Sequence, residues 1–306
     1  MGQRAWLGGC AVVVCAGAGA AHGQQDSVLV FTKTAGFRHD CIPAAATAVE
    51  RLGRQRCFSI TRTEDGASFT PGSLAQYDAV IFLCTTGDVL NGEQEAAMEA
   101  FVRGGGGFVG VHSAADTEFG WPFYGELVGA RFANHPAIQA ATVRIERADH
   151  PSTAMLPNPW MRTDEWYNFA SNPRANVQVL ATVDESTYSG GTMGTDHPIA
   201  WCHVVDLGRS WYTAMGHSAG NYSDPVFLEH LSGGILWALG RDALAPCTVD
   251  QNCDGLVDPD DLADFIACFF ENAGGGAVCA AADFNRDGGA DPDDLADYIA
   301  AFFAGC

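Results

Sequence analysis

Six histidines of this chain lie beside turn signals rather than inside helical patterns. They are His39, His112, His135, His197, His203 and His217. Carboxylates and aromatic rings accompany them, notably in the run DEWY at 164–167. Imidazole is a good ligand for zinc and other transition metals, and aromatic rings stack on the apolar C–H faces of sugars. The set predicts a metal site or a polar sugar pocket, although a single loop histidine is usually a hydrogen-bonded structural residue.

Residues 104–116, GGGGFVGVHSAAD, indicate how one of these histidines is presented. A glycine run ends a helical pattern, and a short apolar strand then stops at His112. Open α/β sheets place their ligand sites at the carboxyl edge, where such strands end. A nucleophile elbow has Ser or Cys at this bend, whereas this chain has His112 followed by Ser113.

Several side chains are expected to gather at this edge. Three histidines follow predicted strands and can therefore converge, and a glutamate in the DEWY run is a candidate general base or ligand. His135 with Pro136 is expected mainly to fix a loop. The predicted catalytic set is His39, His112, Glu165 and His217; the predicted substrate-binding set is Asp116 with two candidate sugar platforms, Trp166 and Tyr167.

The last sixty residues contain an internal repeat, because DPDDLAD at 258–264 recurs at 291–297. Each copy completes a loop with oxygen donors at positions 1, 3, 5, 9 and 12 and glycine at position 6, which is EF-hand calcium spacing. A merely solvated acidic tail would not repeat both the spacing and the glycine. The predicted calcium ligands are Asp250, Asn252, Asp254, Leu256, Asp258 and Asp261, then Asp283, Asn285, Asp287, Gly289, Asp291 and Asp294.

Strand and helix patterns alternate through the larger part of the chain. Buried strands are predicted at 27–33, 57–61, 78–84 and 108–111, with helices at 43–53 and 91–102. This alternation predicts a parallel sheet covered on both faces. Antiparallel-looking strands follow at 142–145, 177–183, 199–205 and 209–215, and a closing helix at 227–239.

Charge and the first residues restrict partners and compartment. The net charge of −21, of which −12 lies in residues 247–306, argues against nucleic acid and anionic membranes. Residues 1–23 combine Arg4, an apolar run and a small-x-small end, which predicts a cleaved secretory leader. A membrane anchor is the alternative, but the run is glycine-rich and near the lower length limit. We expect a secreted or cell-surface protein with no span after cleavage.

Nine of the eleven cysteines lie after the predicted leader, and export permits disulfides. Five crowd residues 247–306, so at least one of these is free or pairs elsewhere. Cys57 and Cys84 fall in apolar strand-like runs, which favours plain core thiols at both positions.

The order of motifs in residues 27–240 resembles the ThuA-like family, which is named for trehalose utilisation. The motifs are KTAGFRHD, YDAVIFLCTTGD, GGGFVGVHSAADT, WPFYGELVGARFANHP, TDEWYNF, DHPIAWCH, GRSWYTAMGH and FLEHLSGGILWALG. This resemblance implies a flavodoxin-like sheet similar to class I glutamine amidotransferases, and a carbohydrate-related role. Glutaminase chemistry is not expected, because the thiolate that it needs is missing from the turn at His112.

The duplicated loop and helix of the tail resembles a dockerin, a small all-α calcium module that docks enzymes onto cohesins. The ending FAGC resembles the GC-type dockerin. Dockerins of cellulosome systems usually have hydroxylated residues at loop positions 10 and 11, where this chain has Pro and Asp. A cohesin-like or cell-surface partner is therefore expected rather than a standard cohesin. The expected division is a leader at 1–23, a ThuA-like domain at 24–243 and the dockerin at 244–306.

Two functions remain open at the level of sequence. The first is a secreted protein acting on a sugar or keto-sugar, as a metal-assisted hydrolase, lyase or isomerase that uses a divalent ion such as zinc. The second is a non-catalytic sugar-binding or interaction module displayed through the dockerin. A purely structural calcium-stabilised surface protein would explain the tail but not the histidines.

Overall fold

The computed structural model describes residues 25–241, 249–251, 253, 257–273, 282–284 and 289–304. The predicted leader lies outside these residues. In chain order the larger part contains β1 (Asp26–Phe31), α1 (Ile42–Gln55), β2 (Phe58–Thr63), α2 (Pro71–Leu74), β3 (Ala79–Leu83), α3 (Gly92–Arg103), β4 (Gly107–Val111), α4 (Pro122–Val128), β5 (Phe132–Asn134), β6 (Gln139–Ile145), β7 (Trp160–Asp164), β8 (Asn168–Phe169), β9 (Gln178–Asp184), β10 (Pro198–Val205), β11 (Gly208–Thr213) and α5 (Pro225–Ala238). The tail contains α6 (Pro259–Ala273) and α7 (Pro292–Ala304).

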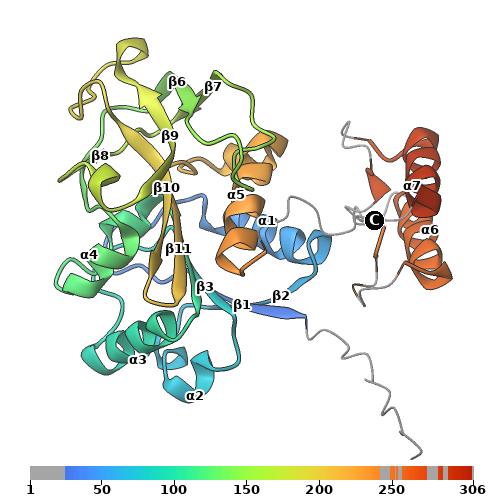
Figure 1. Ribbon diagram of the computed structural model, residues 1–306, viewed down its shortest axis with the longest axis horizontal. Helices are drawn as coiled ribbons and strands as arrows, with labels where there is room; N and C mark the ends of the chain where they lie inside the picture. The colour runs from blue at the N-terminus through green and yellow to red at the C-terminus, as the bar shows by residue number, and fades with distance from the viewer. Residues whose placement is uncertain are drawn as a thin grey trace, which may run out of the picture.

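Nine strands form one mixed sheet in the order β2-β1-β3-β4-β11-β10-β9-β6-β7. The first five are parallel and have the 2-1-3-4-5 order of flavodoxin-like sheets. The prediction of an α/β fold is therefore confirmed (Figure 1). The prediction for 209–215 is wrong in one respect. β11 is antiparallel to β10 but parallel to β4, because the β10–β11 hairpin returns the chain along the open side of β4.

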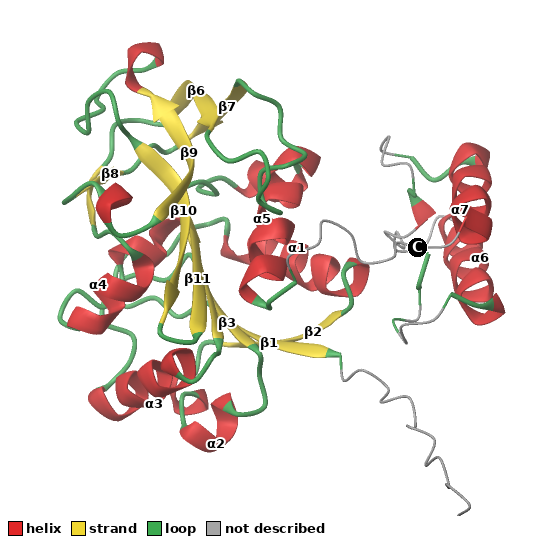
Figure 2. Cartoon of the chain, viewed as in Figure 1, coloured by secondary structure: helices red, strands yellow, loops and turns green. Residues whose placement is uncertain are grey.

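Helices cover both faces of the sheet (Figure 2), α1 and α5 on one side, α3 and α4 on the other. This burial explains why β3 reads AVIFL, with all five residues buried. Local residues fix where the helices begin. Asn91 and Gln94 form a reciprocal capping box at α3, and Asp224 caps α5 immediately before Pro225.

The loops at the carboxyl edge of the parallel strands are joined to one another. Isolated parallel bridges join Thr34 to Thr86 and Gly87 to Thr117, beyond the ends of β1, β3 and β4. The buried carboxylate of Glu118 accepts the amides of Val89 and Leu90, at 2.8 and 2.7 Å. These links hold the edge on which the candidate site is built.

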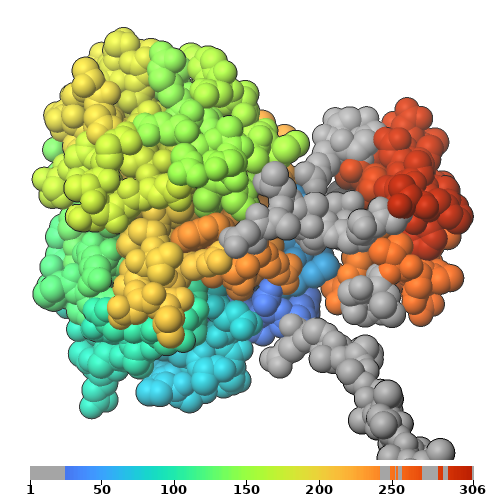
Figure 3. Space-filling model, in the orientation of Figure 1, coloured from blue at the N-terminus to red at the C-terminus, as the bar shows by residue number. Residues whose placement is uncertain are grey.

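The described part of the tail is helical and has its own small core. Phe265 of α6 and Tyr298 of α7 stack with their ring centroids 3.8 Å apart, and the Tyr298 hydroxyl donates to the carbonyl of Val249. In the space-filling view the orange and red atoms of α6 and α7 gather in a group of their own (Figure 3). Among the helices that the structure describes, none is both long and apolar enough to cross a bilayer.

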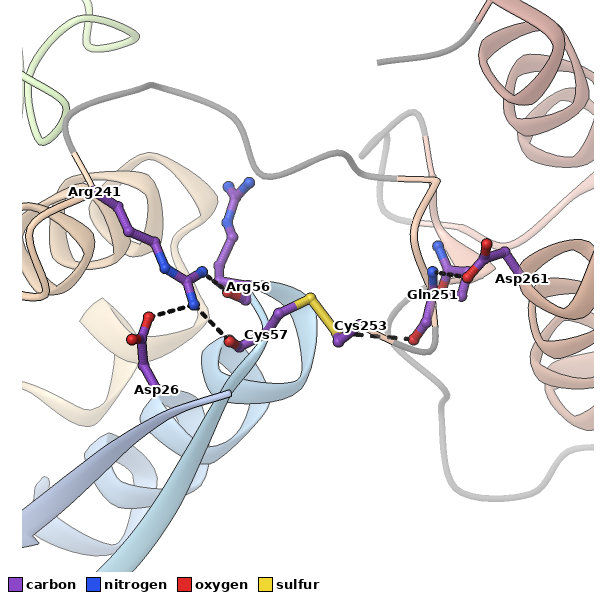
Figure 4. The surroundings of a disulfide bond; sticks show 7 residues. All are labelled: Asp26, Arg56, Cys57, Arg241, Gln251, Cys253 and Asp261. Carbon is purple, nitrogen blue, oxygen red and sulfur yellow. Dashed lines mark hydrogen bonds and ion pairs between the residues drawn. A yellow bond between two sulfur atoms is a disulfide. The ribbon is translucent and has the colours of Figure 1, made fainter. Parts of the chain in front are cut away.

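A disulfide joins Cys57, just before β2, to Cys253 in the tail (Figure 4). The prediction that Cys57 is a plain core thiol is therefore wrong. Its neighbour β2 is the edge strand of the sheet, and a side chain that precedes an edge strand can reach another part of the chain. Arg241 supports this point by donating to the carbonyls of Arg56 and Cys57, at 2.7 and 2.8 Å. Cys84 is a buried free thiol, as predicted.

Thiol mapping tests this pairing. When the unfolded, unreduced chain is alkylated and digested, we expect a peptide that contains Cys57 to be disulfide-linked to a peptide that contains Cys253. Cys41, Cys84 and Cys202 should be alkylated, because all three are free cysteines. Mass spectrometry that finds Cys57 alkylated would contradict the disulfide, and a reduced sample provides the control.

Candidate functional site

The four predicted catalytic side chains follow four strands that point in one direction. His39 lies in the loop after β1, and His112 directly follows β4. Glu165 directly follows β7, and His217 follows β11. The strand pairings make β7 codirectional with β11, and β1 and β4 are parallel to it. All four side chains therefore lie at the carboxyl edge, as the sequence predicted for three of them.

Curvature of the sheet brings Glu165 to the histidines. β7 is four positions from β11, and strands about 4.8 Å apart would place the two roughly 19 Å apart in a flat sheet. Asp164, at the end of β7, nevertheless accepts the amides of Gly216 and His217 just after β11, at 2.9 and 3.1 Å. The sheet is therefore strongly curved, and register shifts between β9 and β10 add local twist.

Three donor atoms form a closed triangle at the centre of the cluster. Nε2 of His112 lies 3.2 Å from Nδ1 of His217, and Oε2 of Glu165 lies 3.5 and 3.1 Å from these two nitrogens. His39 offers a fourth ligand atom, and the four atoms all lie within 4.8 Å of one another. His39, His112 and Glu165 are buried, whereas His217 is partly exposed.

This triangle has the dimensions of one face of a metal coordination tetrahedron. Bonds of about 2.1 Å at a tetrahedral angle place neighbouring ligand atoms roughly 3.4 Å apart, close to the three observed separations. Three imidazoles with one carboxylate also suit zinc and similar ions in donor chemistry. The residues present therefore fit a divalent transition metal.

The tautomer of His112 follows from its second ring nitrogen. Nδ1 of His112 donates to the carbonyl of Ala214 at 2.7 Å, which leaves a lone pair on Nε2 toward the cluster. Metal-binding histidines are commonly oriented by such a hydrogen bond. His112 also has a φ of 52°, a left-handed conformation that is costly for a non-glycine residue and is concentrated at functional sites.

The cluster sets the charges of its members. Burial and the charges of His112 and His217 lower the pKa of His39 to about 3, so His39 is neutral at physiological pH. Burial alone would raise the pKa of Glu165, but the electrostatic interaction of its carboxylate with the neighbouring His112 and His217 outweighs burial and holds that pKa well below its ordinary value. The hydrogen bond with Glu165 in turn raises the pKa of His217. An anionic carboxylate thus lies among the imidazoles.

Asp164 holds the segments that carry two of these side chains. Its carboxylate is fully buried, and it receives hydrogen bonds from β7 itself, from the loop after β11 and from the turn before α5. The donors are the amides of Glu165, Gly216 and His217, the side-chain amide of Asn221 and the guanidinium of Arg162, at 2.9–3.1 Å. One side chain therefore fixes the backbone of both Glu165 and His217.

Comparison with known proteins agrees with the motifs. The family described as ThuA, trehalose utilisation, matches residues 27–238, which is more than half of the chain. The chain belongs to the ThuA family. A comparison with the curated proteins gave no match.

Two solved ThuA-like proteins share the fold. The protein from Bacteroides uniformis is 24% identical, with a TM-score of 0.62 over 74% of this chain and 96% of its own. The protein from Parabacteroides merdae is 16% identical, with a TM-score of 0.59 over 73% of this chain and 93% of its own. At these identities the likeness establishes the fold, in agreement with the flavodoxin-like sheet.

Two of the predicted substrate-binding residues of this ThuA domain, Trp166 and Tyr167, are buried and offer no open face to a sugar. The indole of Trp166 is fully buried and donates to the carbonyl of Gln139, so the prediction of a sugar platform there is wrong. Tyr167 is also buried, and its hydroxyl lies 3.2 Å from Nε2 of His112, so it lines the cluster without offering an open face. Asp116 is half-buried, which raises its pKa.

The contributions of two residues of this ThuA domain, His135 and Asp164, were not predicted from the sequence. His135 bonds through Nδ1 to the carbonyl of Pro136 at 2.8 Å, in agreement with the expectation that it fixes a loop, but the same nitrogen also lies 3.1 Å from Oε1 of Glu165, and its side chain is 40% exposed. The sequence did not indicate the role of Asp164, because most of its hydrogen-bond partners are backbone amides, which no residue type reveals. For His135 the sequence offered only its place among the six histidines beside turn signals.

The described residues among the predicted calcium ligands include two equivalent positions at the starts of α6 and α7. Asp261 and Asp294 are fully buried, and each accepts the amide three residues before it, that of Asp258 or Asp291, at 2.9 and 2.8 Å. Asp250, Asp283 and Gly289 are also described. The remaining predicted ligands lie outside the described residues; they are Asn252, Asp254, Leu256, Asn285 and Asp287.

Replacing Asp164 tests its structural role in this ThuA domain. Asp164→Asn keeps the size but presents N–H groups to N–H donors, and breaking a buried charge pair costs about 3–5 kcal/mol of unfolding free energy. We expect a large fall in the urea midpoint followed by fluorescence. Asp149→Asn removes a surface pair with Arg147 and should leave the midpoint unchanged. Equal midpoints for the two variants would contradict the assignment.

Proposed function

We propose that the large domain is a metal-assisted enzyme acting on a sugar or keto-sugar. The closed triangle of His112, His217 and Glu165 donor atoms is the observation that carries the proposal. Membership of a family described by trehalose utilisation supports a carbohydrate substrate. The reaction class is a hydrolysis, lyase or isomerase step, and glutaminase chemistry is excluded because a histidine replaces the thiol at the turn after β4.

The residues of the cluster would have two roles, which are to bind the ion and to transfer a proton. His39, His112 and His217 would hold the ion together with Oε2 of Glu165. A bound divalent ion polarises a carbonyl or hydroxyl of the sugar. Oε1 of Glu165 lies 3.1 Å from Nδ1 of His135, and Glu165 can take a proton from the substrate.

A metal-free sugar-binding site is the second candidate, and one observation favours it. The polar atoms of the cluster can be satisfied without an ion, because the Tyr167 hydroxyl can donate to His112 and the His217 ring can donate to Glu165. This candidate predicts sugar binding without turnover and without a bound transition metal.

Metal analysis separates the two candidates. The full chain, incubated with zinc and desalted, should retain about one more zinc ion than the His112→Ala/His217→Ala variant, because the variant loses two of four ligands. Elemental analysis by mass spectrometry measures the content.

His203→Gln is the matched control, since His203 bonds to the carbonyl of Glu126 outside the cluster. Equal zinc content in the wild type and the double variant would remove the metal proposal and favour the binding module.

We further propose that the tail is a GC-type dockerin that binds calcium and docks onto a cohesin-like or cell-surface partner. The buried Asp261 and Asp294, at position 12 of the two repeats, support this proposal, as does the helix that follows each loop. Export is part of the same proposal, and the Cys57–Cys253 disulfide supports it because such bonds persist in oxidising compartments.

Calcium titration tests the tail. The metal-stripped full chain should bind two calcium ions by calorimetry, and Asp261→Asn or Asp294→Asn should each remove one, because position 12 supplies a charged ligand. The exposed neighbours provide controls, so Asp260→Asn and Asp293→Asn should still bind two. Two ions bound by an Asp261→Asn/Asp294→Asn variant would refute this reading.

A further inference from the structure

Phe37 is a large apolar side chain exposed next to the metal-binding cluster. It is 67% exposed and lies in the loop between β1 and α1, two residues before His39. The Phe37 and His39 rings meet edge to face, with their centroids 4.9 Å apart. Single exposed apolar residues are common on protein surfaces. An exposed apolar side chain in contact with a polar site, however, presents an apolar surface to a ligand of that site.

The backbone around Phe37 is fixed, so the position of the ring is defined. The hydroxyl of Thr86 donates to the carbonyl of Phe37 at 2.7 Å, and the amide of Ala35 donates to the carbonyl of Thr86 at 2.7 Å. On the other side Arg38 pairs with Glu64 at 2.7 Å. The loop thus presents an aromatic ring from a held backbone, as rigid binding sites do.

A continuous succession of rings leads from Phe37 to the candidate metal ligands. The ring of His39 meets those of His112 and His217 at 4.8 and 5.2 Å, both edge to face. If a polar group of a ligand reaches these imidazoles, the part of the ligand that is bonded to that group can therefore lie beside Phe37. That portion must offer an apolar surface to pack well against the phenyl ring.

We propose that Phe37 forms a subsite for the apolar C–H face of a pyranose ring whose oxygen atoms reach the cluster. This inference rests on the proposed function and names the surface that selects a sugar. Phe37 takes the platform role that the sequence assigned to Trp166 and Tyr167, both of which are buried. A pyranose ring has an apolar face and polar edges. The Phe37 ring suits the apolar face, and the imidazoles suit the polar edges.

The test measures sugar affinity in the zinc-loaded full chain. The probes are trehalose, glucose, galactose and mannose, measured by calorimetry and by saturation-transfer NMR. Phe37→Ala should weaken binding of the preferred sugar roughly three- to tenfold, and Phe37→Trp should restore it, because stacking needs an aromatic face. Leu207→Ala is the matched control, since Leu207 is 74% exposed in the β10–β11 turn, at the opposite edge of the sheet.

Each outcome of this experiment either supports or overturns the subsite. Weaker binding in Phe37→Ala, with zinc content and Leu207→Ala affinity unchanged, supports the subsite. Equal affinity in Phe37→Ala and wild type, or no recovery in Phe37→Trp, overturns the subsite and leaves the proposed function intact. Loss of zinc in Phe37→Ala also overturns it, because the ring would then only support His39. Failure of the wild type to bind any of the four sugars overturns the subsite, whereas the zinc content of the His112→Ala/His217→Ala variant decides the metal proposal separately.

Discussion

The buried carboxylate of Asp164 is the constraint on which the candidate site depends. It joins the end of the last strand of the sheet to the loop after β11, although three strands lie between them in the sheet order. A buried charge is tolerated only where hydrogen bonds compensate its desolvation, and five donors do so here. Three of the five bonds, those from the amides of Glu165, Gly216 and His217, fix the backbone of Glu165 and His217. The hydrogen bonds that satisfy the buried charge of Asp164 therefore also hold the curved sheet together and assemble the cluster.

The site combines this fixed edge with local strain. His112 adopts a left-handed backbone at the end of β4, and Gly216, with a φ of 114°, leaves no room for a side chain beside the hydroxyl of Tyr222. Such conformations persist only where their surroundings impose them. Here the imposed geometry points Nε2 of His112 at the carboxylate of Glu165 instead of at solvent. The low pKa of Glu165 follows from that arrangement, because two imidazoles stabilise its anionic form.

The disulfide between Cys57 and Cys253 adds a covalent cross-link between the tail and the larger domain. Cys253 lies within the first calcium-loop pattern, two residues after Gln251, whose backbone amide donates to the carboxylate of Asp261 at 2.8 Å. The link begins beside the edge strand β2, where Arg241 and Asp26 also form an ion pair. The acidic tail and the larger domain are thus held together at a point where the sheet ends.

Much of this protein was determined by local sequence. The periodicity of the strands and helices, the turn at His112 and the two helices of the tail depend on neighbouring residues, so they could be predicted. Sequence also named His39, His112, Glu165 and His217, because each follows the end of a predicted element or lies in an acidic and aromatic motif. Only tertiary structure decided which way Trp166 points, that Cys57 pairs with Cys253 and that His135 faces Glu165. The physical reason is that these outcomes depend on how far the sheet curves and which strand forms its edge, and both are set by packing between residues distant in the chain.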